Sequence, residues 1–256
     1  MTIEYTGKGD PARSLALLWR TSERVSRKGK PDLSVTRIVW AAIEVADSEG
    51  LQALSMRRVA EKLGVGTMSL YTYVPGKPEL LDVMLDTVYG ETERPGDPPG
   101  GWRERLAQIA RENWRLYLRH PWLLQVATSR PVLGPHLSAK YDYELRALDG
   151  IGLTDVEMDA VLTLVTGFVH GTARGAVEAA QAESQTGLTD EQWWAAHAPF
   201  LARIADPSRF PVAARVGQAT GEAHGSAYSP EHAFEFGLER VLDGIEALIT
   251  QRTGEA

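Results

Sequence analysis

The segment from Ser55 to Val74 constrains the fold more strongly than any other part of the chain. Ser55 predicts the start of a helix, because its hydroxyl can accept a hydrogen bond from a free amide of the first turn. The apolar residues that follow have the spacing of a buried helix face: Met56, Val59, Ala60 and Leu63. Gly64 suits a left-handed helix end, and a second short helix is predicted over residues 67–73 before Pro75-Gly76. This pattern predicts a helix-turn-helix unit.

The second helix of this unit is expected to present a small, weakly polar face to solvent, because only Leu70 and Val74 fit a core position. Such a helix can enter the major groove of B-DNA, where hydroxyls bond to base edges and methyl-bearing groups touch thymine. Nearby cations and phenols suit phosphate oxygens. Structural packing of three helices is the alternative interpretation. The predicted DNA contacts are Ser55, Met56, Arg57, Thr67, Met68, Ser69, Tyr71, Thr72, Tyr73 and Lys77.

Charge is distributed unevenly along the chain. The net charge is −7, yet residues 20–78 hold ten basic and six acidic side chains, so this part carries +4 and the remainder −11. A basic front end joined to an acidic body is expected when only one end meets DNA. The arm of Arg24, Arg27, Lys28 and Lys30 is predicted either to enter a minor groove or to serve as a disordered solubilising tail.

Helical periodicity runs through almost the whole chain, and no alternating strand stands out, so the predicted fold class is all-α. Residues 1–32 are predicted as a flexible basic extension, 33–92 as the DNA-binding domain and 102–252 as a helical ligand-binding and dimerisation domain. Within the last, helices are expected over 102–119, 121–128, 135–149 and 154–183. Two more start near Thr189 and Ser229, and residues 205–228 give no clear pattern.

The run LSVTRIVWAAIEVADSEGLQALSMRRVAEKLGVGTMSLYTYVPGKPELLDVML, from Leu33 to Leu85, resembles the N-terminal domain of TetR-family repressors without a break. This resemblance implies that Ser69, Tyr71, Tyr73 and Lys77 contact the DNA backbone. It implies that Arg57, Thr67 and Met68 occupy base-reading positions. Gly66 and Met68 are less polar than the residues of the tetracycline repressor there, so its operator sequence is not transferable.

The remainder resembles the tetracycline-repressor branch more loosely, through WRERLAQIARENWRLYLRHPWLL and Gly175 to Val177. In that branch a His and a Glu hold a magnesium–drug complex, and these positions fall near Val126 or Ala127 and near Ala179. None of these side chains ligates a cation. We therefore predict no metal–tetracycline ligand, no metal site and no cofactor.

Two further sites are predicted in the second domain. Aromatic residues and a histidine on converging helices suggest an apolar pocket, with ordinary core packing as the alternative: Trp114, Tyr117, Trp122, Tyr141, Phe168 and His170. A strip of small residues and the apolar face of the last helix suggest a homodimer interface, with intrachain packing as the alternative: Gly167, Gly171, Gly175, Leu238, Val241, Leu242 and Ile245.

These observations favour a homodimeric repressor that binds a palindromic double-stranded DNA operator and is released by a small-molecule effector. An activator or a ligand-independent DNA binder shares every N-terminal feature. A helical enzyme is disfavoured, because the six histidines are scattered without a metal-spaced pair or an activated nucleophile. The absence of cysteine fits a reducing compartment, and no membrane span or export signal stands out, so a cytoplasmic location is expected.

Overall fold

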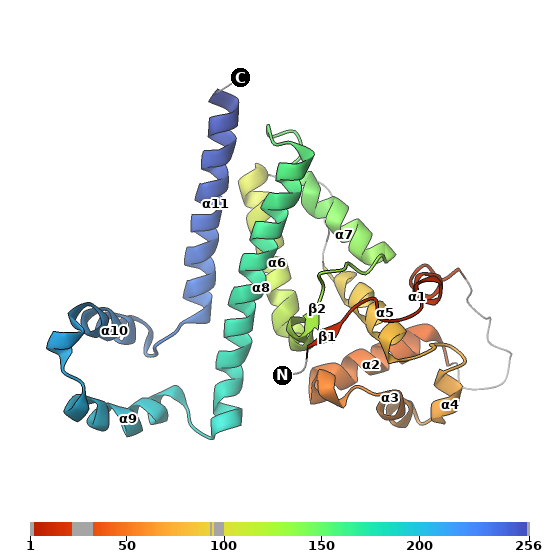
Figure 1. The fold of residues 1–256 in the computed structure, drawn as a ribbon, viewed down its shortest axis with the longest axis horizontal. Helices are drawn as coiled ribbons and strands as arrows, with labels where there is room; N and C mark the ends of the chain where they lie inside the picture. Colours follow the sequence, from red (N-terminus) through yellow and green to blue (C-terminus); the bar gives the residue numbers. More distant parts are fainter. Residues whose placement is uncertain (1–2, 22–32, 93, 95–99, 255–256) are drawn as a thin grey trace.

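The computed structural model describes residues 3–21, 33–92, 94 and 100–254, and these residues form a predominantly helical, two-domain fold (Figure 1). The N-terminal domain contains α2 (Val35–Glu49), the 3₁₀ turn η1 (Leu51–Ala53), α3 (Met56–Leu63), α4 (Thr67–Leu70) and α5 (Lys77–Tyr89). The C-terminal domain contains α6 (Trp102–Arg119), η2 (Pro121–Gln125), α7 (Pro135–Arg146), α8 (Asp155–Thr186), α9 (Asp190–Ile204), η3 (Pro207–Arg209), α10 (Pro211–His224) and α11 (Pro230–Gly254). The predicted all-α class is confirmed.

Local capping signals set the ends of the helix-turn-helix unit. The Ser55 hydroxyl accepts a hydrogen bond from the amide of Arg58 at 3.1 Å, so α3 begins where the sequence predicted. Gly64 has φ +67°, a left-handed conformation that side chains other than glycine disfavour, and it ends α3. The following helix α4 is shorter than the predicted 67–73. Leu70 and Val74 are both fully buried and hold it against the domain core.

Helix α5 contacts α1, α2 and α7. It is buried around most of its circumference, including three carboxylates, Glu79, Asp82 and Asp86. Buried carboxylates need hydrogen-bond donors, and two chain segments supply backbone amides to them. The amide of Leu137 at the start of α7 donates to Asp86 at 2.9 Å, which ties the two domains together.

Three long helices, α6, α8 and α11, lie side by side and form the core of the C-terminal domain (Figure 1). Leu238, Leu242 and Ile245 of α11 are buried in this core, and Val241 packs against it. The predicted dimer role is therefore wrong for Leu238, Leu242 and Ile245, whose side chains are buried within the protomer, whereas that of the half-buried Val241 stays a prediction. The same apolar stripe that could join two chains joins α11 to α6 and α8 of its own chain instead.

The N-terminal segment corrects two further predictions. Part of the segment predicted as a flexible extension instead forms strand β1 (Glu4–Tyr5) and helix α1 (Pro11–Leu18), and α1 packs on α5. The predicted helix over 121–128 is instead η2 followed by strand β2 (Val126–Ala127), which pairs in parallel with β1. Each strand has two residues, and its partner lies about 120 residues away in the chain, so local periodicity carries no sign of the pair.

Helices α9 and α10 form an arm that projects from the body between the ends of α8 and α11 (Figure 1). None of the described residues in these two helices is buried. Helix α9 starts after Thr189, near the predicted position, with a capping box formed by Thr189 and Gln192, and α10 lies within residues 205–228, where no pattern was clear. By length and composition α8 could cross a membrane, but a soluble protein's core helix meets the same criterion, and α6 and α11 pack along α8.

Candidate DNA-reading surface and ligand cavity

Helix α4 presents the predicted reading face to solvent. Met68 is 77% exposed, and Ser69, Tyr71 and Thr72 are also exposed. Thr67 and Tyr73 are half-buried, and Tyr73 packs against the domain core. Thr67, Met68 and Ser69 lie on α4 and the other three in the turn after it, and the buried Leu70 holds both against the domain core. The arrangement suits shallow, partly apolar readout of a major groove.

The cations around α4 are all engaged in ion pairs within the described chain. Arg57 lies 2.9 Å from Glu61, and Lys62 lies 2.9 Å from Glu44. Arg58 bonds to Glu49 at 2.7 Å through a guanidinium nitrogen, and this pair lowers the pKa of the Glu49 carboxyl. Lys77 lies 2.9 Å from Glu4, which belongs to the N-terminal segment rather than to this domain. A DNA phosphate must compete with these carboxylates for the same donors.

The predicted DNA contact by the Met56 side chain is wrong, because this side chain is buried. Met56 is only 6% exposed and belongs to the domain core, because it occupies the first buried position of α3. Ser55 and Arg57 on either side of it are exposed, as an amphipathic helix requires. The basic arm residues Arg24, Arg27, Lys28 and Lys30 lie outside the described residues.

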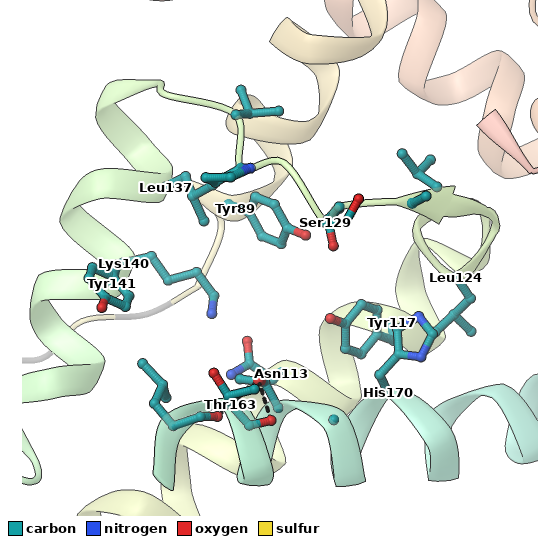
Figure 2. Close-up of a pocket in the computed structure, with 18 of the residues that line it drawn as sticks. Tyr89, Asn113, Tyr117, Leu124, Ser129, Leu137, Lys140, Tyr141, Thr163 and His170 are labelled. Atoms are coloured by element: carbon teal, nitrogen blue, oxygen red, sulfur yellow. Dashed lines mark hydrogen bonds between the residues drawn. The ribbon is translucent and has the colours of Figure 1, made fainter. Parts of the chain in front are cut away.

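A cavity of about 840 Å³ lies in the C-terminal domain, and Tyr89 at the end of α5 adds to its wall from the N-terminal domain. Its walls come from the end of α5, from α6, α7 and α8, and from the extended chain over Val126–Val132. Figure 2 shows side chains from opposite walls pointing into it, including Tyr89, Lys140, Asn113 and His170. The volume lies in the range of small-molecule sites, and the lining mixes aromatic rings with a few polar groups.

A buried charged group marks one side of the cavity. Lys140 and Glu144, one turn apart on α7, have side chains that are 8% and 7% exposed, and the ammonium bonds to Glu144 Oε1. Asn113 of α6 donates to the same oxygen at 2.7 Å. The Lys140 ammonium also lies 5.7 Å from the centre of the Tyr89 ring. An ammonium has three donors, so Lys140 retains hydrogen-bonding capacity toward the cavity.

Three titratable groups in the cavity wall, Tyr89, Tyr117 and His170, have pKa shifts that favour their neutral forms. Burial raises the pKa of Tyr117 to about 12, with a further contribution from the Glu144 carboxylate. Burial also raises the pKa of Tyr89, so both phenols remain hydrogen-bond donors at neutral pH. Burial, and secondarily the charge of Arg174, lowers the pKa of His170, which favours its neutral imidazole.

Half of the six predicted pocket residues line the cavity: Tyr117, Tyr141 and His170. The predicted pocket role is wrong for the others. Trp114 and Phe168 stack on Phe234 of α11 with ring centres 4.7 and 6.0 Å away, so they fill the core behind the cavity. Trp122 is 1% exposed and donates from its indole nitrogen to Asp47 at 2.8 Å. The predicted pocket missed Tyr89, Asn113, Lys140 and Glu144, because helical spacing does not show which faces meet.

A cluster of three polar residues, His120, Asp47 and Glu91, connects the two domains, and sequence patterns did not indicate it. The ring nitrogens of His120 lie 2.8 Å from Asp47 Oδ1 and 3.1 Å from Glu91 Oε2. Asp47 lies near the end of α2, Glu91 follows α5, and His120 follows α6. The three residues therefore connect the N-terminal domain to the C-terminal domain. The signal available in the sequence was a His-Pro-Trp run directly after a long helix.

The small-residue strip on α8 divides into two parts. A side chain at Gly167 or Gly171 would meet open space, whereas one at Gly175 would meet the Tyr228 hydroxyl at 2.7 Å. Gly167 also lines the cavity. The strip is therefore not closed by another helix of the same chain at its first two positions. Among the described residues, no group of three or more His, Asp or Glu side chains is arranged to hold a metal ion.

A short exposed helix on a helical N-terminal domain, joined to a helical domain with a large open cavity, is the architecture of a helix-turn-helix DNA-binding regulator. The chain belongs to the TetR family. Residues 38–84 match the family described as bacterial regulatory proteins, tetR family, and residues 94–249 match the tetracyclin repressor-like C-terminal domain. It is a TetR-family helix-turn-helix transcriptional repressor that binds DNA through this motif, and the family is non-enzymatic.

Relatives of known role support the same assignment. The chain is 48% identical over 257 residues to the HTH-type transcriptional repressor DrrR1 of Streptomyces coeruleorubidus, covering 100% of this chain and 93% of DrrR1. It is similar to ActR of Streptomyces coelicolor in complex with actinorhodin, with TM-score 0.67 and 30% identity over 86% of this chain and 99% of ActR. The ActR complex with (S)-DNPA gives TM-score 0.66 and 30% identity over 85% and 99%.

Proposed function

We propose that this repressor acts as a homodimer on a near-palindromic operator, and that a small molecule in the cavity between α5, α6, α7 and α8 releases it. The observation that supports this most directly is the cavity itself, because its wall includes Tyr89 at the end of α5, the helix that begins at Lys77 beside the reading helix. A ligand can shift the DNA-binding equilibrium only through different affinities for the bound and released forms. A cavity that shares α5 with the reading domain can supply that difference.

The cavity chemistry favours a particular kind of ligand. Its wall offers the spare donors of Lys140 and the neutral phenols of Tyr89 and Tyr117, all of which need acceptors when water is excluded. Aromatic rings supply the apolar surface around them. We expect an aromatic molecule that carries carbonyl or other acceptor oxygens, one of which accepts from Lys140. The complex of the related ActR with actinorhodin is consistent with this expectation.

The dimer is expected to use surfaces that one protomer leaves exposed. Leu164 of α8 is 54% exposed and Phe236 of α11 is 57% exposed, on the two helices joined by the α9–α10 arm. Gly167 and Gly171 on α8 leave space for the close approach of another helix. A two-fold dimer places two reading helices about 34–36 Å apart and so reads two half-sites one DNA turn apart. A cytoplasmic location follows for a regulator of this kind.

Selection of bound duplexes from a random pool, followed by footprinting, tests the operator half of the proposal. We expect a protected near-palindrome with half-sites 10–10.5 base pairs apart, centre to centre. A single unpaired half-site would contradict the dimer. Sedimentation of the wild type and of Leu164→Asp tests the dimer separately.

Release from the selected duplex tests the effector half. The first probe is actinorhodin, followed by a panel of aromatic ketones and quinones and their oxygen-free ring analogues. Lys140→Met should weaken binding of the acceptor-bearing compounds, whereas Arg146→Met, an exposed cation on the same helix, should not. Release of wild type and of Lys140→Met by the same concentrations would contradict the role of Lys140. A ligand-independent repressor would show no release by any compound.

A further inference from the structure

The N-terminal strap, defined here as residues 3–19, donates three hydrogen bonds to the Glu79 and Asp82 carboxylates of α5. The amide of Gly7 donates to Asp82 Oδ1 at 3.2 Å, and the hydroxyl of Ser14 donates to Asp82 Oδ2 at 3.1 Å. The amide of Asp10 donates to Glu79 at 3.2 Å. Gly9 lies so close that an added Cβ would stand 2.5 Å from Glu79 Oε1. The strap therefore lies directly on the helix that starts at Lys77.

The other side of the strap is fastened to the cavity wall. Strand β1 pairs with β2 in the register Glu4 with Val126 and Tyr5 with Ala127. The Thr6 hydroxyl donates to the carbonyl of Arg130 at 2.6 Å, and the Trp19 indole donates to the carbonyl of Leu133 at 2.8 Å. The residues that line the cavity from this segment are Val126, Ala127, Thr128, Ser129, Pro131 and Val132. The strap thus bridges the wall of the cavity and the reading domain.

Two adjacent residues of the strap reach different surroundings, one at the cavity and the other at Lys77 of the N-terminal domain. Ile3 lines the cavity, and Glu4 bonds to the Lys77 ammonium at 2.9 Å. Successive side chains of an extended chain point to opposite faces, which explains how neighbours reach such different surroundings. Both members of the Glu4–Lys77 pair are about one third exposed, so the pair is open to competition from a DNA phosphate.

We propose that the docked strap restrains DNA binding, with Glu4 withdrawing Lys77 from the DNA backbone, and that a ligand in the cavity stabilises the docked strap through Ile3. This inference rests on the proposed ligand role of the cavity. Ligand and operator then compete for the position of one segment. By linkage, operator binding weakens ligand binding by the same factor by which the ligand weakens operator binding.

A double-mutant cycle on the operator duplex tests the role of Glu4. Glu4→Gln removes the competing carboxylate, and we expect roughly threefold tighter operator binding in about 0.1 M salt, the scale of an exposed ion pair. The gain should vanish in a Lys77→Met background. Glu44→Gln is the matched control, because Glu44 pairs with Lys62 in the same domain and its effect should persist in that background. A Glu4→Gln gain that also persists there would overturn the specific role of Lys77.

A reversible lock tests the strap without any small molecule. The chain has no cysteine, so Tyr5→Cys with Ala127→Cys allows one disulfide between the paired strands. Paired strands lie about 4.8 Å apart, within the span of a disulfide. We expect the oxidised protein to bind the operator roughly threefold more weakly than the same protein after reduction, and we expect no difference when Glu4→Gln is added. Equal binding before and after reduction would overturn the proposal.

Because neither test uses a ligand, failure of the strap and failure of the proposed effector are separable. If the lock has no effect while a small molecule still releases the wild type, the cavity acts through another route. If the lock weakens binding while no molecule releases the wild type, the strap operates but the effector half of the proposed function fails.

Discussion

Removing one partner of the buried Lys140–Glu144 pair should destabilise the protein far more than removing an exposed pair of the same spacing. Glu144→Gln keeps the shape of the side chain but leaves a buried ammonium without its counter-ion and changes the acceptor that Asn113 uses. Loss of one member of a buried ion pair costs about 3–5 kcal/mol. Because the cavity opens on one side of the pair and admits water, we expect about 3 kcal/mol, the lower end of that range.

Arg174 and Glu178 on α8 provide the matched comparison, since they are also four residues apart but have side chains 54% and 58% exposed. Glu178→Gln should change the free energy of unfolding by less than about 0.5 kcal/mol. Urea unfolding followed by tryptophan fluorescence measures both variants. We expect a clear fall in the midpoint for Glu144→Gln and almost none for Glu178→Gln. Equal small effects would refute the argument that burial decides the cost.

The apolar replacement of both partners separates charge burial from packing. Lys140→Met with Glu144→Leu removes both charges at similar volume, and such replacements are often neutral or stabilising. We expect the double variant to regain most of the stability lost in Glu144→Gln, apart from about 1 kcal/mol for the Asn113 amide left without its acceptor. A double variant as unstable as Glu144→Gln would show that shape rather than charge governs this site.

Three further predictions follow from burial and charge. Met68→Ala should weaken operator binding in a gel-shift assay without changing the free energy of unfolding. Met56→Ala should lower the free energy of unfolding in urea by about 2–4 kcal/mol. The reverse pattern would contradict the assignment of Met56 to the core. Leu242→Ala should cost about 2–4 kcal/mol by the same measurement and leave the dimer intact on sedimentation, whereas Leu164→Asp should dissociate the dimer with little loss of protomer stability. The Thr154 amide and the Arg252 guanidinium lower the pKa of Glu157 to about 2. The stabilising contribution of Glu157 is therefore present above about pH 4.5 and is lost as the pH falls toward 2. Glu157→Gln should make the free energy of unfolding depend less on pH across this window.

Local chemistry explains which parts of the fold the sequence predicted well. A serine hydroxyl beside a free amide and a glycine with positive φ act within one turn of chain, so the bounds of α3 could be predicted from Ser55 and Gly64 alone. The helix expected over 154–183 likewise begins where Thr154 and Glu157 form a capping box, which also acts within one turn. The exposed positions of α4 followed from periodicity, because a short helix on a core has only one face to bury.

Contacts between distant segments explain the failures. The stripe of Leu238, Leu242 and Ile245 is equally consistent with a partner chain and with α6 and α8, and the choice depends on where these helices lie in space. Trp122 has the composition of a pocket residue, but its indole finds Asp47, which is 75 residues away. The N-terminal strap is ordered because its backbone amides bind the buried carboxylates of α5, and this contact can be predicted only once α5 is placed in space.

The three carboxylates of α5 give the clearest link from sequence to mechanism. Glu79, Asp82 and Asp86 share one face of the helix by spacing, and acidic residues at such positions ordinarily face water. Here all three are buried, and their oxygens accept hydrogen bonds from backbone amides of the strap and of the start of α7. Isolated buried carboxylates would be costly, so these oxygens require their donors, and the strap and α7 are held to α5. The strap also pairs with β2 in the cavity wall, and α7 forms another part of that wall. A displacement of the wall is therefore transmitted to α5, whose first residue is Lys77.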